Sequence, residues 1–163
     1  MKAYLGLGSN LGDRFRNLSE AVKHLGQVSG IRITRASHVY ETDPVGYPDQ
    51  PPYLNAVLEV ETLLEPVNLL RACLAVEQGM GRVRSKRWES RIIDIDLLIY
   101  ESEVISTMEL MVPHPLLHER EFVLRPLADI APGIMHPVLE ETIAELLCRV
   151  EESGVRIVEE LVL

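Results

Sequence analysis

Residues 92–100 read Ile92-Ile93-Asp94-Ile95-Asp96-Leu97-Leu98-Ile99-Tyr100, the strongest strand pattern in the chain. Apolar and acidic residues alternate at first, as in a strand with one buried face, and the second half is wholly apolar. We expect this strand to lie at the centre of a sheet. Side chains alternate along a strand, so Asp94 and Asp96 share one face while Ile95 and Leu97 share the other.

Strand and helix patterns alternate along the rest of the chain. Strands are predicted at 4–8, 31–40 and 53–62, helices after Asp13 and from Pro66, a hairpin at 104–112, partly helical structure at 116–128, a helix at 142–150, and an edge strand or tail at 155–162. Val67, Leu70 and Leu74 are the expected core stripe of the second helix. No repeat or linker interrupts these elements, so we expect one α+β domain over residues 1–163.

Composition narrows the class of protein. The 163 residues carry a net charge of −9, a poor balance for a protein that binds nucleic acid. No apolar run is long enough for a membrane span, and Gly8 interrupts the N-terminal apolar segment before a signal peptide forms. Cys73 and Cys148 are isolated, as in a reduced cytosolic protein. We therefore expect a cytoplasmic monomer.

Asp94 and Asp96 are the first candidate site. Two carboxylates about 7 Å apart on one strand face repel each other unless a cation lies between them. Mg²⁺ fits this arrangement, because it takes one or two carboxylates and completes its octahedron with water and substrate phosphates. The alternative is a half-exposed strand with polar residues facing solvent.

A basic segment precedes this strand. Residues 82–91 contain five basic residues and one acidic residue, in an acidic protein. Arg82 and Arg84 suit phosphate, since a guanidinium binds it bidentately, and Trp88 could cover a flat ligand. The alternative is a solvated basic loop. Arginines for phosphate followed by aspartates for metal predict a magnesium-dependent phosphate-transfer site.

Other motifs give less evidence about function. The chain has no G-x-x-x-x-G-K-[ST] phosphate loop, and the spacing of Gly6, Gly8 and Gly12 is explained by a tight strand-to-helix turn. His114 and His118 do not make a zinc pair, because Pro115 disrupts the helix that would align them. A phosphate-contacting or structural role is expected for His114.

A series of motifs then resembles 6-hydroxymethyl-7,8-dihydropterin pyrophosphokinase of folate synthesis. The match runs in order from residue 1 to about 132, leaving a helix and tail at 133–163. Its motifs are Gly8-Ser9-Asn10-Leu11-Gly12-Asp13-Arg14, Glu41-Thr42-Asp43-Pro44-Val45-Gly46, Gln50-Pro51-Pro52-Tyr53-Leu54-Asn55, Gly81-Arg82-Val83-Arg84, Arg87-Trp88, Arg91-Ile92-Ile93-Asp94-Ile95-Asp96-Leu97-Leu98, Val112-Pro113-His114-Pro115 and Arg120-Glu121-Phe122-Val123-Leu124 followed by Pro126-Leu127.

The resemblance implies a ferredoxin-like sandwich with a mainly antiparallel sheet flanked by helices. It implies transfer of pyrophosphate from ATP to the pterin's hydroxymethyl group, leaving AMP. Asp94 and Asp96 would hold two Mg²⁺ ions that bridge the ATP phosphates. The residues implied at the phosphates and the nucleotide are Arg82, Arg91, His114 and Arg120, with Arg84 closing over them, and Glu77, Trp88 and Leu97.

The same resemblance implies where the pterin binds. Tyr53 and Phe122 would stack on its two faces, and Asn55 offers the donor and acceptor that match its amide edge. The backbone from Thr42 to Val45 would contact that edge, with Trp88 closing over the ring. The alternative for Tyr53 and Phe122 is core packing.

Two positions depart from the family pattern. Glu89-Ser90 stands where many relatives have glycine or alanine and then proline, which predicts a looser junction between loop and strand. Leu74 stands where some relatives carry a glutamine that contacts ATP. Two rival functions stay open at this point, a metal-dependent nuclease or phosphodiesterase and a silent nucleotide- or pterin-binding module.

Overall fold

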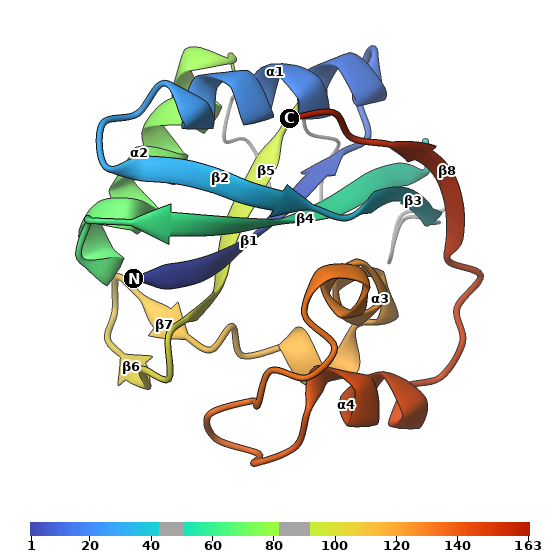
Figure 1. Cartoon of the computed structure of the whole chain (residues 1–163). Coiled ribbons are helices and arrows are strands. Elements are labelled where there is room, and N and C mark those ends of the chain that lie inside the picture. The colour runs from blue at the N-terminus through green and yellow to red at the C-terminus, as the bar shows by residue number, and fades with distance from the viewer. Residues whose placement is uncertain (43–50, 82–91) are drawn as a thin grey trace.

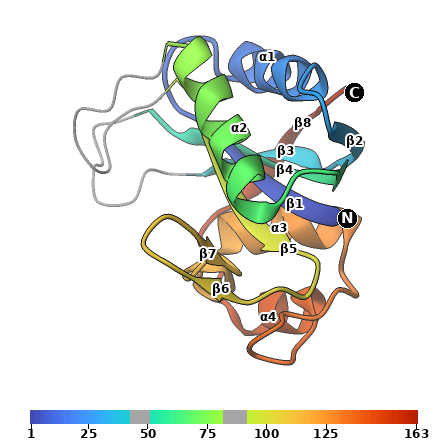
Figure 2. The ribbon, with the colours of Figure 1, turned by 90° about the vertical axis from the view of Figure 1, so that its left-hand side faces the viewer.

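The computed structural model describes residues 1–42, 51–81 and 92–163. These residues form a six-stranded sheet between two layers of helices (Figure 1; Figure 2). The strands, in the order β5-β1-β4-β3-β8 with β2 also on β4, are β5 (Asp94–Tyr100), β1 (Lys2–Ser9), β4 (Tyr53–Thr62), β3 (His38–Thr42), β8 (Arg156–Glu160) and β2 (Ile31–Ala36). All pairings between them are antiparallel.

The helices divide between the two faces of the sheet. The helices α1 (Arg14–Gly26) and α2 (Pro66–Gly79) cover one face, and α3 (Glu121–Ile130) and α4 (Ile143–Arg149) lie on the other (Figure 1). A short hairpin of β6 (Ile105–Ser106) and β7 (Met111–Val112) and the 3₁₀ helix η1 (Leu117–Glu119) connect β5 to α3. Every helix in the described ranges is too short or too polar to span a bilayer.

The order of elements up to β5 is that of a ferredoxin-like fold. One strand and helix, a hairpin, and a second helix and strand follow each other, and β4 lies between β1 and β3. The predicted α+β class is therefore confirmed, as are the hairpin at 104–112, the helix at 142–150 and the edge strand at 155–162.

The predicted central position of the 92–100 strand is wrong. Within the described residues β5 pairs only with β1, at one end of the sheet, and β4 is the central strand. The apolar run arises instead because helices cover both faces of this edge. Leu97 belongs to the cluster under α1 and α2, whereas Leu98 and Ile99 pack with Leu124. A register shift between Tyr4 and Leu5 in the pairing of β1 with β5 accompanies this change of side.

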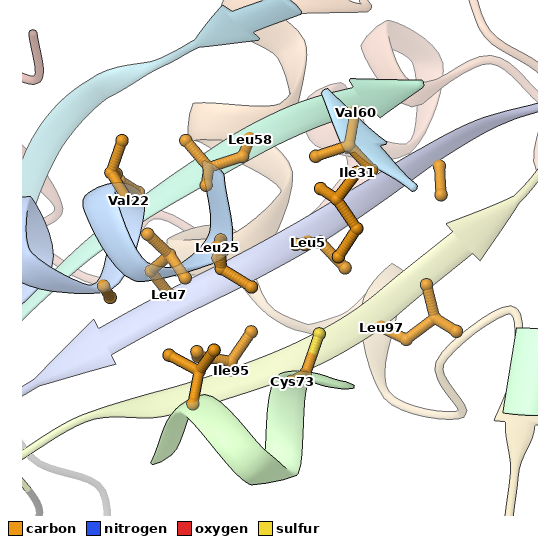
Figure 3. Close-up of a cluster of buried hydrophobic side chains, with 14 of the residues drawn as sticks. Leu5, Leu7, Val22, Leu25, Ile31, Leu58, Val60, Cys73, Ile95 and Leu97 are labelled. Atoms are coloured by element: carbon orange, nitrogen blue, oxygen red, sulfur yellow. The ribbon is translucent and has the colours of Figure 1, made fainter. Parts of the chain in front are cut away.

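Two hydrophobic clusters result, one on each face of the sheet. Leu5 and Leu7 of β1 and Ile95 of β5 point toward α1 and α2, where they meet Leu25 and Cys73 (Figure 3). The second cluster packs under α3 and α4, around Tyr4, Val57, Leu98, Leu124 and Leu127. The sheet is thus buried on both sides, and each strand residue takes its environment from its position in the alternation.

Local rules explain where the first helices begin. Asp13 caps α1, since its Oδ1 accepts from the backbone N of Arg16 at 3.1 Å, and Pro66 occupies the first turn of α2. The face of α2 that is buried differs slightly from the predicted one. Its buried apolar residues are Leu69, Cys73 and Val76, while the predicted Val67, Leu70 and Leu74 are only partly buried.

Candidate active site

Asp94 and Asp96 lie on the sheet face covered by α3. Both are half-buried, and Ile95 between them is buried on the opposite face. The antiparallel register sets Asp94 opposite Gly8 and Asp96 opposite Gly6. The alternation read from the sequence therefore holds, and the two carboxylates face the same space.

Gly6 and Gly8 leave that space open. They lie within β1, so their role is not the strand-to-helix turn predicted from sequence; Gly12, with φ +69°, occupies the turn. A Cβ added to Gly8 would lie 3.3 Å from Asn55 Oδ1, and one added to Gly6 would lie 3.3 Å from Leu98 Cδ1. Because Gly6 and Gly8 have no side chains, the space over β1 stays open and connects the carboxylates of β5 with the polar groups of β4.

Glu77 holds the backbone between the two aspartates. Its side chain, on α2, is buried, and its Oε1 accepts from the backbone N of Ile95 at 2.6 Å. A buried carboxylate that accepts from an N–H makes a strong, charge-assisted bond. The direction of the Asp94 and Asp96 side chains is thus fixed from the far side of the strand.

Tyr53, Asn55 and Thr42 form the next part of the site. Thr42 lies opposite Tyr53 in the pairing of β3 with β4, and Asn55 Nδ2 donates to Thr42 Oγ1 at 3.0 Å. This bond fixes the orientation of the Asn55 amide and directs its Oδ1 toward Gly8. Arg14 fixes the backbone just before β4, since its Nη1 donates to the Pro52 carbonyl at 2.7 Å.

The opposite wall comes from the start of α3. The Arg120 guanidinium carbon lies 5.5 Å from the centre of the Phe122 ring, a cation–π contact. The helix is tied to the sheet by Asp129, which accepts from the Tyr40 hydroxyl at 2.8 Å and from the backbone N of His38 at 3.2 Å. Neither Phe122 nor Tyr53 belongs to the two clusters that the described residues form, which weighs against core packing for both.

His114 follows β7 and lies near Asp94. Its Nδ1 accepts from the backbone N of Leu116 at 3.2 Å, so Nε2 is the N–H donor of the neutral ring. Burial, with the positive charge of Arg120, lowers the pKa of His114, and the nearby Asp94 partly opposes this. The lowered pKa favours the neutral form of the ring.

Many of these residues line one cavity of about 830 Å³, a size typical of small-molecule sites. The cavity reaches from the β5 carboxylates to the start of α3. The predicted site residues among those that line it are Thr42, Tyr53, Asn55, Asp94, Asp96, His114, Arg120 and Phe122.

Comparison with known families assigns this arrangement. The family described as 7,8-dihydro-6-hydroxymethylpterin-pyrophosphokinase (HPPK) matches residues 4–132. The chain belongs to the HPPK family. It is thus a pyrophosphokinase of folate synthesis, which transfers pyrophosphate from ATP to hydroxymethyldihydropterin.

Bacterial relatives of similar length support the assignment. The chain is 46% identical over 158 residues to the 2-amino-4-hydroxy-6-hydroxymethyldihydropteridine pyrophosphokinase of Methylorubrum extorquens, covering 97% of this chain and 99% of that protein. It is 44% identical to the Bacillus subtilis protein of the same name, covering 95% and 89%. The folic acid synthesis protein fol1 of Schizosaccharomyces pombe is 43% identical, over 95% of this chain but 21% of that protein.

Solved structures show the same fold at lower sequence identity. A crystal structure of Plasmodium falciparum HPPK-DHPS with pteroate superposes with a TM-score of 0.74, at 20% identity, covering 91% of this chain and 42% of that chain. At this identity the match is evidence for the fold alone.

The structure brings most of the described candidates to one site but separates two of them. Leu97 is buried under α1 and α2, on the face opposite Asp96, and Glu77 lies beneath the strand; neither is among the described residues that line the cavity. Predictions for Val45, Arg82, Arg84, Trp88 and Arg91 lie outside the described residues, as does the Glu89-Ser90 departure.

Sequence reasoning missed the residues that shape the cavity without reacting. Gly6 and Gly8 were the best signal available, since glycines at alternate positions of a strand leave one face bare. The segment after α4 also lines the cavity, through Val150, Glu151 and Ser153. Nothing local in that segment points to a substrate, because only the tertiary fold brings it to the site.

Proposed function

We propose that Asp94 and Asp96 are the residues that would hold two Mg²⁺ ions while this pyrophosphokinase transfers pyrophosphate from ATP to the hydroxymethyl group of 6-hydroxymethyl-7,8-dihydropterin and releases AMP. The observation that supports the proposal is their common face. Both carboxylates open on the cavity that Tyr53, Asn55 and Phe122 line from the other side. A pterin between those residues would have its substituent directed toward the aspartates.

The two aspartates fit magnesium. They supply hard oxygen ligands from a rigid strand, and the described residues contain no group of three or more His, Cys, Asp or Glu arranged to hold a metal. Mg²⁺ needs no such cage, because water and substrate phosphates complete its octahedron. When bound, the ions would neutralise phosphate charge and ease deprotonation of the attacking hydroxyl.

The pterin would bind by stacking and by its amide edge. Tyr53 on β4 and Phe122 on α3 come from opposite layers, as a sandwich requires. Asn55, fixed by its bond to Thr42, keeps an acceptor oxygen toward the cavity, and the backbone from Thr42 to Val45 would complete the edge. This half of the site binds and orients the acceptor.

The phosphates would be bound by cationic and neutral donors. Arg120 and the Nε2–H of His114 are donors from described residues that line the cavity. Arg82, Arg91 and Arg84 would add guanidinium groups, and Trp88 would cover the ligands, by their positions in the family motifs. Glu77 and Leu97 are the remaining nucleotide candidates, and Glu77 would act by holding the backbone of Ile95.

An AMP-release assay tests this proposal. AMP should form only when ATP, Mg²⁺ and the hydroxymethyl dihydropterin are all present, and EDTA should stop it. Formation of ADP in place of AMP, or of product in EDTA, would contradict the proposal. We further propose that the protein is a monomer, and light scattering after gel filtration checks this.

A further inference from the structure

The connection from α4 to β8 forms one wall of the candidate active site. Val150, Glu151 and Ser153 line the same cavity as Phe122 and Asn55. The chain leaves α4 on one side of the sheet and runs past the sheet edge to β8 (Figure 1). The family match ends at residue 132, so this wall is built by a part of the chain outside the matched range.

Glu121 is the first anchor of this wall. Its carboxylate is buried, and its Oε2 accepts from the backbone N of Ser153 at 2.9 Å. Glu121 directly precedes Phe122, the candidate stacking residue on α3. A charge-assisted bond in a buried position is strong, so the wall and Phe122 are held as one unit.

Glu41 is the second anchor, at the other end of the connection. Its carboxylate accepts from Arg14 Nη1 at 3.0 Å and is also bonded to Arg156 Nη2, where β8 pairs with β3. Burial alone would raise the pKa of Glu41, but the bonds from Arg14 and Arg156 outweigh burial and lower it. Glu41 directly precedes Thr42, so each anchor adjoins a candidate pterin-binding residue.

Charge decides which substrate this wall faces. Between Arg149 and Arg156 the charged residues of the connection are Glu151 and Glu152, and Glu151 lines the cavity. A carboxylate on the connection opposes the approach of a triphosphate but not of an uncharged ring. The wall therefore suits the pterin, whereas the phosphates belong with the magnesium sites.

We propose that residues 150–156 are the outer wall of the pterin pocket, and that Glu121 and Glu41 are positioning residues that hold it closed on the ring. The inference rests on the proposed function of the site. It assigns a role in pterin affinity to a segment outside the residues proposed to bind the metal ions and the phosphates. Loosening the wall should weaken pterin binding and leave ATP binding and the chemical step intact.

The first test is Glu121→Ala beside Glu121→Gln. Glu121→Ala removes the acceptor for the Ser153 N–H, so KM for the pterin should rise about tenfold, with kcat and KM for ATP within about twofold. Glu121→Gln keeps a carbonyl acceptor and should recover most of the affinity. Pterin Kd without ATP, from quenching of protein fluorescence, should follow KM, and circular dichroism checks folding.

A second pair of variants keeps the test decisive if Glu121→Ala does not fold. Arg156→Ala breaks the bond to Glu41, and Arg71→Ala breaks a pair with Glu109 in which the arginine is similarly exposed and neither residue lines the cavity. Only Arg156→Ala should raise pterin KM, by about threefold. Equal effects of the two variants, or equal rises in KM for ATP and pterin, would overturn the inference.

The outcomes separate this inference from the proposed function. If the wild-type protein releases no AMP from ATP and the pterin, the proposed function fails, whatever the variants do. If the wild type is active and folded Glu121→Ala keeps the wild-type pterin KM and Kd, the wall has no role in affinity and the inference alone fails.

Discussion

The two faces of β5 differ in the side chains that they carry, although both follow the same strand alternation. Toward α1 and α2, Ile95 and Leu97 are 2% and 3% exposed and fill the core (Figure 3). Toward α3, Asp94 and Asp96 are half-buried and face glycines of β1. The first face is filled with apolar side chains, whereas the second stays open because the β1 residues opposite the aspartates are glycines.

Over residues 94–97, this contrast assigns stability to the face toward α1 and α2 and chemistry to the face toward α3. Apolar burial against α1 and α2 stabilises the fold, whereas two carboxylates about 7 Å apart repel each other and contribute nothing comparable. Substitutions of neighbouring residues should therefore have separable effects, on turnover for one face and on unfolding for the other. The most direct test compares Asp96 with Ile95.

Asp96→Ala should have the largest effect. Loss of one of two carboxylates proposed to bind metal should lower kcat by at least about 10³-fold, with the free energy of unfolding within about 0.5 kcal/mol of wild type. Single-turnover AMP formation and urea denaturation measure the two quantities. Near wild-type turnover would remove the metal assignment, and a large loss of stability would break the contrast between the faces.

Ile95→Ala should give the reverse result. The side chain is buried in the α1 and α2 cluster, so its loss should cost about 2–5 kcal/mol of unfolding free energy. Turnover of the folded fraction at low temperature should stay within about threefold, because Glu77 still accepts from the backbone N of residue 95. A large loss of kcat at saturating substrate, measured at 15 °C, would show that the two faces are not separable.

Gly8→Ala tests whether the open face depends on missing side chains. The added Cβ would lie 3.3 Å from Asn55 Oδ1 and 3.6 Å from Tyr53 Cδ1, so pterin KM should rise about tenfold while stability changes by less than about 1 kcal/mol. Gly133→Ala is the matched control, since its Cβ would meet nothing within 4 Å. Equal pterin KM in both variants would mean that the open face tolerates a methyl group.

The open face was also harder to predict from sequence than the filled one. Strand alternation alone was enough to set Asp94 and Asp96 apart from Ile95, because the period of two is a property of the backbone. The resemblance supplied Tyr53, Asn55 and Phe122 as partners. The role of Gly8 depends on register with Asn55, however, and register is a tertiary fact that no local pattern contains.

The prediction that β5 is a central strand was wrong for the same reason, because strand neighbours are also set by the tertiary fold. A wholly apolar run shows that both faces are covered, but not whether strands flank it. Here α2 and α3 cover the two faces of a strand that pairs with β1 alone among the described strands. The wall at 150–156 could not be predicted from the sequence either, since the residue that holds it, Glu121, lies 32 residues before Ser153 in the chain.

A buried histidine on the α3 and α4 side offers the smallest and most specific test. His136, in the loop before α4, is 4% exposed and is the one buried histidine among the described residues. Its Nδ1 accepts from the backbone N of Val138 and of Leu139, at 3.2 and 3.1 Å. Protonation of the ring would remove this acceptor.

Stability should therefore fall in acid through His136. Burial, with a smaller contribution from His118, lowers the pKa of His136 below 6.5, so the unfolded chain takes up the proton first. Its contribution is complete above pH 6.5 and is lost as the pH falls below that value. Between pH 7.5 and 5.5 the wild type should lose more unfolding free energy than His136→Asn, which keeps an acceptor oxygen but does not titrate. Urea denaturation at both pH values measures the difference, and equal losses in the two proteins would exclude His136 as its source.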